Sequence, residues 1–346
     1  MSLKHIIYLS SICLLFLACE KAFITPAPSE EPEQVFETFW QLVDENYCLF
    51  EEKQVDWQAL YDANRSKITN ENTVDAQLKR ILEEMLAELK DGHVNLRTPT
   101  SRSRFDYTEG FPRNFDRNVL YRNYLNNNPA LAEVGALLKA VIDSVIYIRI
   151  PSFGSLNNGS GVDLNPDIMD DEFDAILAEH PNTKGLIIDV RENGGGNTGN
   201  PDAILARFID QPTLAYHLRP KNGPNRNDFG PAAGFNIEPR APQYLKKVVL
   251  LTNRASYSAT NYFASIMKNI PDNVTVIGGK TGGGGGLPTY KDLPNGWLLR
   301  LSVTQLLDLN QQQIEGGIEP DLNVELTDAD IEKGKDTILE FALGMF

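Results

Sequence analysis

The stretch from Val248 to Met267 indicates a buried strand, a polar turn and a helix in direct succession. Its apolar, β-branched start, 248–251, is typical of a buried strand, and the apolar residues of 262–267 recur with helical spacing. Ser258 falls where strand gives way to helix, beside N–H groups that have no intrahelical partner. Such a serine can cap the helix, its commoner role, or act as a nucleophile with oxyanion donors already in place.

From residue 141 onward, strand and helix patterns alternate, which predicts an α/β domain. We expect strands at 145–150, 185–190, 274–277 and 297–303, and helices at 169–180, 200–209 and after Thr327. The polar segment 219–243, rich in proline and glycine, is predicted to be a long loop of the kind that rims a site.

The N-terminal third of the chain carries helical periodicity. Apolar residues in 35–47 and in 74–89 follow helical spacing, so we predict a small helical N-terminal domain over 33–92 and an α/β core over 93–346. Segment 97–140 has no clear periodicity.

The first 18 residues have the form of a signal peptide, with Lys4 and His5 before a mostly apolar run that is short for a membrane span. The run ends in Leu15-Phe-Leu-Ala-Cys19, which resembles a lipobox. We therefore expect residues 1–18 to be removed, Cys19 to carry lipid, and 19–32 to tether the protein to the cell envelope. The alternative is an ordinary signal peptide cut elsewhere.

The charge balance and the cysteine count limit which partners and which covalent links the protein can have. The 47 acidic residues against 32 basic ones argue against nucleic acid and anionic lipid. With Cys13 removed and Cys19 lipidated, Cys48 has no disulfide partner. Asp91-Gly-His93 offers too few ligands for a metal site, and we expect neither metal nor cofactor.

A glycine cluster follows the expected strand at 185–190. Gly194, Gly196 and Gly199 satisfy G-x-G-x-x-G, so a nucleotide-binding enzyme built on Gly194–Gly199 is one hypothesis. Residues 191–193 separate the strand from the first glycine, which argues against it. The alternative is that the glycines bring backbone N–H groups close to a reacting carbonyl, as in an oxyanion hole.

Five motifs together resemble the serine peptidases of the C-terminal-processing and tricorn-core family. They are Leu89-Lys-Asp-Gly-His93, Gly185-Leu-Ile-Ile-Asp-Val-Arg-Glu-Asn-Gly-Gly-Gly196, Leu251-Thr-Asn-Arg-Ala-Ser-Tyr-Ser258-Ala, Val276-Ile-Gly-Gly-Lys-Thr-Gly282 and Glu315-Gly-Gly-Ile-Glu-Pro-Asp321. The resemblance implies a core related to the ClpP and crotonase fold, with Ser258 as nucleophile. It also implies an oxyanion hole made by the N–H of Ala259 and that of Gly195, with Gly194 as the neighbouring alternative.

The family activates its serine in two ways. One branch uses a lysine that would fall near 283–284, where this chain has glycine, and Lys280 stands a few residues too early. The tricorn-like branch uses a histidine and a glutamate at the positions of His93 and Glu315. Gly92 replaces the serine that tricorn has before its histidine, so the motif does not say how Glu315 would couple to His93. Segment 97–140 is also too short for the PDZ domain that many members carry.

The resemblance thus implies a serine endopeptidase that acts on polypeptides through an acyl-enzyme, and the signal peptide predicts that it is exported. The main rival is a non-catalytic peptide- or ligand-binding lipoprotein on the same fold, because fold does not fix function. No substrate-binding residue is predicted.

Overall fold

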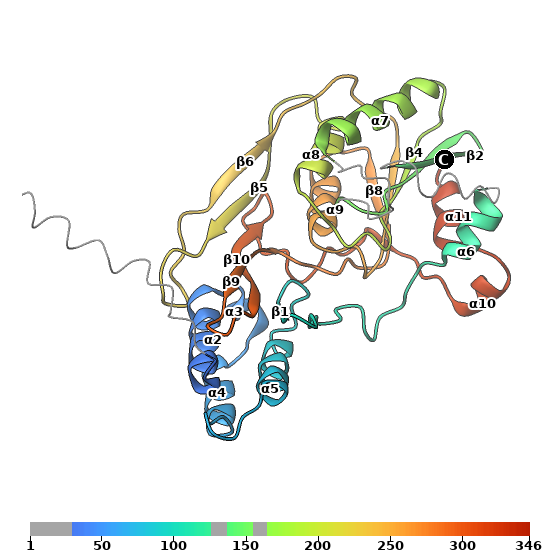
Figure 1. The fold of residues 1–346 in the computed structure, drawn as a ribbon. Coiled ribbons are helices and arrows are strands. Elements are labelled where there is room, and N and C mark those ends of the chain that lie inside the picture. The colour runs from blue at the N-terminus through green and yellow to red at the C-terminus, as the bar shows by residue number, and fades with distance from the viewer. Residues whose placement is uncertain (1–29, 126–136, 155–164) are drawn as a thin grey trace, which may run out of the picture.

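The computed structural model describes residues 30–125, 137–154 and 165–346 (Figure 1). The predicted signal peptide, Cys19 and most of the tether lie outside the described residues. Within the described ranges, no helix combines the length and apolar character needed to cross a bilayer.

A six-stranded sheet, in the order β11-β8-β7-β4-β3-β2, forms the centre of the α/β region. All neighbouring strands pair in parallel except β2, which pairs antiparallel with β3 at the edge. Its strands are β2 (Leu138–Ile142), β3 (Val145–Arg149), β4 (Leu186–Asp189), β7 (Val248–Thr252), β8 (Val274–Gly278) and β11 (Leu322–Asn323). Every residue of β3, β4 and β7 is buried, as the continuous apolar runs predict for strands covered on both faces.

Helices cover both faces of this sheet. In β7, Val248 and Leu250 face an apolar cluster that includes the helices of one side, whereas Val249 and Leu251 face the cluster of the other side. The first side holds α7 (Pro166–Glu179), α8 (Gly199–Leu205) and α9 (Ala259–Asn269). The second holds α6 (Arg117–Val119), the π-helical turn η1 (Leu120–Tyr124), α10 (Asp328–Glu332) and α11 (Thr337–Leu343). The predicted α/β class is confirmed.

A second sheet joins the α/β region to the N-terminal helices. Its order is β1-β10-β5-β6, and β9 also pairs with β10. The strands are β1 (Asn95–Arg97), β5 (Thr213–Pro220), β6 (Ala233–Ile237), β9 (Gly286–Asp292) and β10 (Leu298–Leu307). The loop expected over 219–243 is therefore wrong in part, because β6 lies inside it. Residues 233–236 are exposed, so β6 has no apolar alternation to reveal it.

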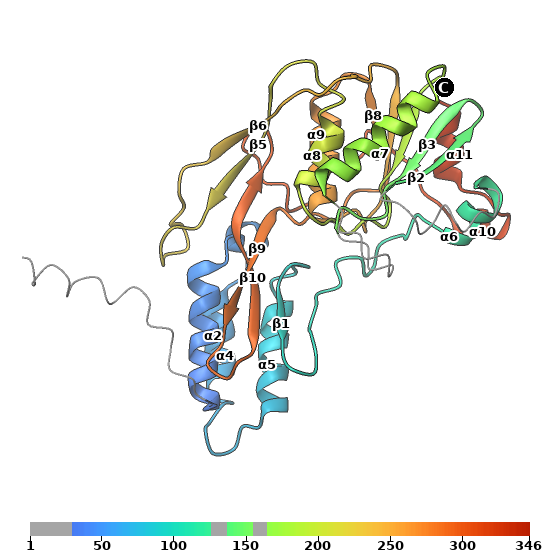
Figure 2. The same cartoon turned by 45° about the horizontal axis from the view of Figure 1, so that its top comes forward.

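The N-terminal helices share their apolar core with the β9–β10 hairpin. These helices are α2 (Pro32–Asn46), α3 (Phe50–Lys53), α4 (Trp57–Arg65) and α5 (Asp75–Ala87). Phe39, Trp57 and Leu82 lie in one buried cluster with Leu299 and Leu301 of β10. Figure 2 shows the hairpin extending from the α/β region along these helices. The helical region thus completes its core with strands from the other end of the chain.

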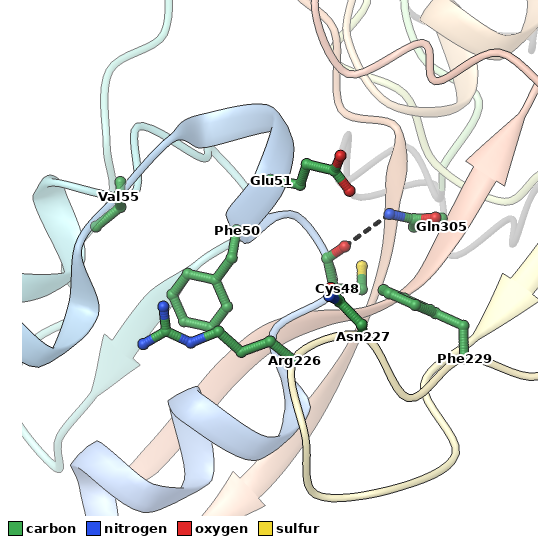
Figure 3. Close-up of a pocket in the computed structure, with 8 residues that line it drawn as sticks. All are labelled: Cys48, Phe50, Glu51, Val55, Arg226, Asn227, Phe229 and Gln305. Atoms are coloured by element: carbon green, nitrogen blue, oxygen red, sulfur yellow. Dashed lines mark hydrogen bonds between the residues drawn. The ribbon is translucent and has the colours of Figure 1, made fainter.

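The junction of the two regions contains a cavity of about 290 Å³ (Figure 3). Phe50, Arg226 and Phe229 contribute to its wall, together with Cys48 and Gln305. Gln305 Nε2 donates to the carbonyl of Cys48 at 2.8 Å, and Cys48 N donates to the carbonyl of Ser302 at 2.9 Å. One side-chain and one backbone hydrogen bond therefore fix the segment between α2 and α3 to β10.

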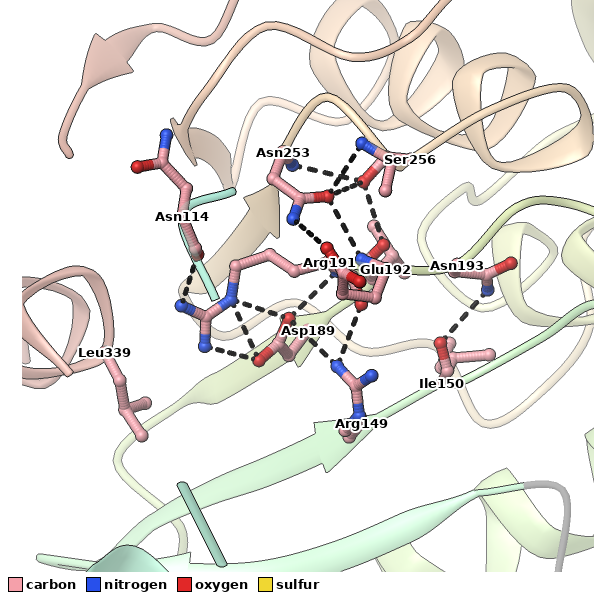
Figure 4. Close-up of polar contacts among 12 residues, drawn as sticks. Asn114, Arg149, Ile150, Asp189, Arg191, Glu192, Asn193, Asn253, Ser256 and Leu339 are labelled. Carbon is pink, nitrogen blue, oxygen red and sulfur yellow. Dashed lines mark hydrogen bonds and ion pairs between the residues drawn. The ribbon is translucent and has the colours of Figure 1, made fainter. Parts of the chain in front are cut away.

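A buried ion network joins the end of β4 to the start of α11. Figure 4 shows the contacts of Arg191 with Asp189 and Asn114. Arg191 is fully buried and donates to both Asp189 (2.7 Å from Nη2) and Asp336 (2.8 Å from Nη2). Asp336 also caps α11, because its Oδ1 accepts from Leu339 N at 3.1 Å. Two carboxylates offset the cost of burying the guanidinium and hold the chain where the glycine cluster begins.

Removing one carboxylate should destabilise the fold strongly. Asp336→Ala leaves Arg191 buried with half of its partners and removes the cap of α11, so we expect a loss of about 3–5 kcal/mol in the free energy of unfolding. Urea denaturation measures it. The control is Glu84→Ala, whose ion pair with Arg80 is exposed and should contribute less than about 1 kcal/mol. Equal midpoints for the two variants would contradict the importance of the network.

Candidate active site

Ser258 occupies a sharp turn between β7 and α9. Its φ of 59° and ψ of −120° are unfavourable for a residue with a side chain, and surrounding hydrogen bonds hold this conformation. Ser258 N donates to the carbonyl of Gly283 at 2.8 Å, and Tyr257 N donates to that of Asn193 at 3.1 Å. The Ser258 side chain makes no capping hydrogen bond to α9. The geometry therefore does not support helix capping, the commoner role for a serine at this position.

His93 lies directly against this turn. Its Nε2 is 2.8 Å from Ser258 Oγ, although the two residues are far apart in sequence. The imidazole is 5% exposed and packs on the ring of Tyr257 at 4.9 Å. Burial lowers the pKa of His93 to about 4, and the charges of Arg300 and Arg104 act in the same direction against the opposing charge of Asp91. The ring is therefore neutral at physiological pH and able to accept a proton.

The carboxylate nearest to the other ring nitrogen belongs to Asp91. Asp91 Oδ1 is 3.9 Å from His93 Nδ1, and Nδ1 has no hydrogen-bond partner among the described residues. Asp91 is fully buried and accepts from Tyr47, Tyr257 and Ser302. Sequence reasoning did not single out Asp91 as a functional residue. The available signal was an acidic residue two positions before a histidine on a turn.

Glu315 lies in the same buried region with different partners. Its Oε2 accepts from Gly285 N at 2.6 Å, and its Oε1 is 2.5 Å from Lys53 Nζ. Lys53 Nζ also donates to the carbonyl of Lys90 at 2.8 Å, next to Asp91. In the described part of the chain, no hydrogen bond joins Glu315 to His93; Lys53 bridges the glutamate to the turn that carries the histidine.

The two buried carboxylates repel each other. Burial, followed by the charge of Asp91, raises the pKa of Glu315 to about 7, while Lys53 and the N–H of Gly285 act in the opposite direction. The ionisation of Glu315 therefore depends on a cation supplied by α3 of the helical region.

The glycine cluster packs against the Ser258 turn. Gly195 is buried at φ 96°, and a Cβ built there would lie 2.8 Å from Ala259 N. Gly195 N already donates to Asn193 Oδ1 at 2.9 Å. Gly194 is exposed, and neither Gly194 N nor Ala259 N has a partner among the residues that the structure describes. Between the two candidate glycines, the free donor is that of Gly194.

Lys280 forms its ion pair with a residue outside this group. Its Nζ pairs with Glu319 Oε1 at 2.8 Å, and both side chains are largely exposed. The positions where a lysine base would fall, 283–284, are buried glycines that pack on Ser258 and Glu315.

Substitution of Gly195 tests whether the donors beside Ser258 matter. Gly195→Ala places a methyl group against Ala259 N, so we expect labelling of Ser258 by a fluorophosphonate to fall by about 10²–10³-fold, as when one oxyanion donor is lost. Mass spectrometry of the labelled peptide measures this. Gly316→Ala is the control, because nothing lies within 4 Å of a Cβ at that position. Unchanged labelling of correctly folded Gly195→Ala would contradict the assignment.

Comparison with known proteins places this chain in a family. The model of peptidase family S41 matches residues 144–324, and that of the tricorn protease C1 domain matches residues 28–87. A solved structure of a candidate peptidase from Parabacteroides merdae ATCC 43184 is 37% identical, with a TM-score of 0.80, and the match covers 92% of this chain and 97% of that one. Mature CPAF, at 14% identity and a TM-score of 0.66, covers 90% of this chain and 95% of its own, and shows the fold alone.

One curated relative matches only in part. The carboxy-terminal processing protease CtpA of Bacillus subtilis (strain 168) is 28% identical over 151 residues, which are 43% of this chain and 30% of CtpA. The S41 model nevertheless matches more than half of the chain, and the Parabacteroides structure is similar over nearly its whole length. The chain belongs to peptidase family S41, a family of serine-type peptidases.

Proposed function

We propose that the protein is an exported serine endopeptidase in which Ser258 attacks a peptide carbonyl and His93 is the general base. The 2.8 Å contact between His93 Nε2 and Ser258 Oγ carries this proposal. As Oγ bonds to the carbonyl carbon, its proton passes to Nε2. The imidazolium returns the proton to the leaving amine, giving the acyl-enzyme. Water, deprotonated by the same nitrogen, then releases the acid product and regenerates the hydroxyl.

The oxyanion would be bound by backbone donors that need no rearrangement. Ala259 N–H lies at the start of α9, and the exposed Gly194 N–H completes the pair better than Gly195 N–H, which Asn193 already occupies. The substrate is thus a polypeptide whose scissile carbonyl enters between the glycine cluster and the helix start.

Two carboxylates support the base in different ways. The imidazolium formed during the reaction is buried, and its cost is offset by Asp91 at 3.9 Å from Nδ1. We assign to Glu315 the supporting role that the family resemblance implies, exerted through Lys53 and the Lys90–His93 turn. This route accounts for the coupling that Gly92 left open.

The nucleophile and base are tested together. Ser258→Ala should abolish both labelling and cleavage, and His93→Ala should lower kcat/KM by about 10²–10⁴-fold because the proton acceptor is lost. Lys280→Ala is the matched control and should stay near wild type, since its amine pairs with Glu319 at the surface. Cleavage of peptide substrates measures all three.

The outcomes separate the rivals. Normal cleavage by His93→Ala with a dead Lys280→Ala would assign the protein to the serine–lysine mechanism. A folded wild-type protein that neither cleaves nor labels would be the non-catalytic binding lipoprotein on the same fold.

The pH dependence of kcat/KM should report the titration of Glu315 rather than that of the imidazole. The lowered pKa of His93 keeps the base neutral above about pH 5, whereas the raised pKa of Glu315 places loss of its charge near neutrality. We expect kcat/KM to rise with pH through about 7 and this limb to disappear in Glu315→Gln. Lys53→Gln should move the limb to higher pH, and Lys53→Arg should restore it. A limb near 6.5 that persists in Glu315→Gln would instead indicate a histidine with its ordinary pKa.

Export rests on residues outside the described structure. We propose that Cys19 carries lipid and tethers the peptidase to the periplasmic or the surface side of a bacterial membrane, as its lipobox-like sequence indicates. Mass spectrometry of the N-terminal peptide from isolated membranes should find an acylated Cys19. An unmodified peptide that begins at another residue would leave secretion without an anchor.

A further inference from the structure

Several arginines close to Ser258 and His93 lack a carboxylate partner. In the described ranges, Arg102, Arg104, Arg254 and Arg300 form no ion pair, although the chain has 47 acidic residues for 32 basic ones. We call these four residues the arginine cluster. By contrast, the buried Arg191 is paired with two carboxylates. Within the part of the chain that the structure describes, the four arginines of the cluster are thus without ion pairs beside Ser258 and His93, although the chain carries more acidic than basic residues.

Arg300 contacts the histidine, Arg104 acts on it through its charge, and Arg102 contacts Asn95, which donates to the carbonyl of His93. Arg300 Nη1 donates to the carbonyl of His93 at 3.2 Å, and the Arg104 guanidinium lies 5.7 Å from the centre of the Tyr107 ring. Arg102 donates to Asn95 Oδ1 at 3.0 Å. Burial, together with the charge of Arg102, lowers the pKa of Arg300, whereas the charge of the buried Asp91 acts in the opposite direction.

Arg254 stands on the other side, in the turn that leads to Ser258. Its guanidinium is half-buried, lies 4.0 Å from the ring centre of Phe111, and donates to two carbonyls, those of Tyr107 at 2.8 Å and Thr281 at 3.2 Å. Burial lowers the pKa of Arg254. A partly desolvated cation with only neutral partners gains from binding an anion.

Two open cavities lie at these arginines. One of about 250 Å³ is lined by Phe111, Arg254, Arg113 and Glu192, and one of about 330 Å³ by Arg104, Tyr107 and their neighbours. Both reach Thr108, and between them Tyr107 stacks on Tyr257 at 3.9 Å, next to the nucleophile.

The acids at these cavities are already engaged. Glu192 accepts from Asn253 Nδ2 at 3.0 Å and pairs with Arg113, and Asp106 accepts from both the N–H and the hydroxyl of Thr108. Among the described residues, neither acid forms an ion pair with a member of the arginine cluster, although the charge of Arg104 helps to lower the pKa of Asp106 after its hydrogen bonds with Thr108.

We propose that the arginine cluster selects peptides that carry a carboxylate close to the scissile bond. The carboxylate can belong to an Asp or Glu side chain or to a free C-terminus, since both offer the same planar anion to a guanidinium. This inference rests on the proposed peptidase function. It also has a kinetic consequence: an anion bound beside Arg104 and Arg300 offsets the charges that disfavour a protonated His93, so an acidic substrate should raise kcat as well as lower KM.

Matched quenched-fluorescent peptide pools test the proposal. The first carries Asp and Glu at fixed positions around a randomised bond and an amidated C-terminus. The second replaces these by Asn and Gln. The third keeps Asn and Gln but has a free C-terminus, which separates the two sources of carboxylate. The wild-type enzyme should cleave the first or third pool with a kcat/KM about tenfold above the second, and added salt should reduce the preference.

Arginine substitutions identify the residues responsible. Arg104→Gln, at an exposed site, and Arg254→Gln should each reduce the preference several-fold while fluorophosphonate labelling of Ser258 is retained. Arg117→Gln is the control; this arginine also lacks a carboxylate partner in the described chain, but stacks on Tyr121 in the helical turns beside the other sheet face. The variant Arg104→Gln keeps the test valid if Arg254→Gln fails to fold.

The outcomes distinguish this inference from the function on which it rests. Equal cleavage of all three pools by an enzyme that labels at Ser258 would overturn the carboxylate selectivity and leave the peptidase intact. A preference that Arg104→Gln and Arg254→Gln share unchanged with wild type would overturn the role of the cluster. No labelling and no cleavage of any pool would overturn the peptidase function and this inference with it.

Discussion

The backbone of Ser258 is the point on which the site depends. A left-handed conformation at a residue with a side chain is unfavourable and persists only when the surroundings fix it. Here two separate segments do so. One supplies the carbonyl of Gly283, and the other supplies the carbonyl of Asn193 that receives Tyr257 N and the Cα of Gly195, which fits only because it bears no side chain. The same contacts that hold the serine also align the N–H groups beside it. Strain and donor placement are therefore two results of one packing arrangement.

The electrostatic properties of the site follow from the burial of two carboxylates in the same region. Asp91 and Glu315 both lie out of water, and neither is compensated by a full complement of cations. Asp91 keeps hydroxyl and backbone donors, whereas Glu315 depends on Lys53. Burial and the charges of Arg300 and Arg104 keep His93 neutral at physiological pH, against the opposing charge of Asp91. The opposing charges make its protonation sensitive to what binds nearby.

The sequence predicts two kinds of feature well: local motifs, and strands that are buried on both faces of a sheet. The strands of the parallel sheet are apolar runs without alternation, and Ser258 falls at the strand-to-helix change within a motif. Strand β6 escapes prediction because it is exposed, and Asp91 because Tyr47, Tyr257 and Ser302 meet it only after folding. Choosing Gly194 over Gly195 needs the side chain of Asn193, which no periodicity indicates. The role of Lys53 cannot be predicted from the sequence for the same reason, because its partner Glu315 is distant in sequence.

The shared core of the N-terminal helices and β10 affects the order in which the protein folds during synthesis. The helices are the first part of the mature fold to be synthesised, yet Cys48 hydrogen-bonds to Ser302 and their apolar cluster includes Leu299 and Leu301. Contacts this distant in sequence close late, since loop-closure entropy must be paid before they form. The supports of His93 and Glu315 lie on these same elements. A nascent chain therefore cannot assemble the site, and the protein gains hydrolytic competence only once nearly all of it has been made and folded.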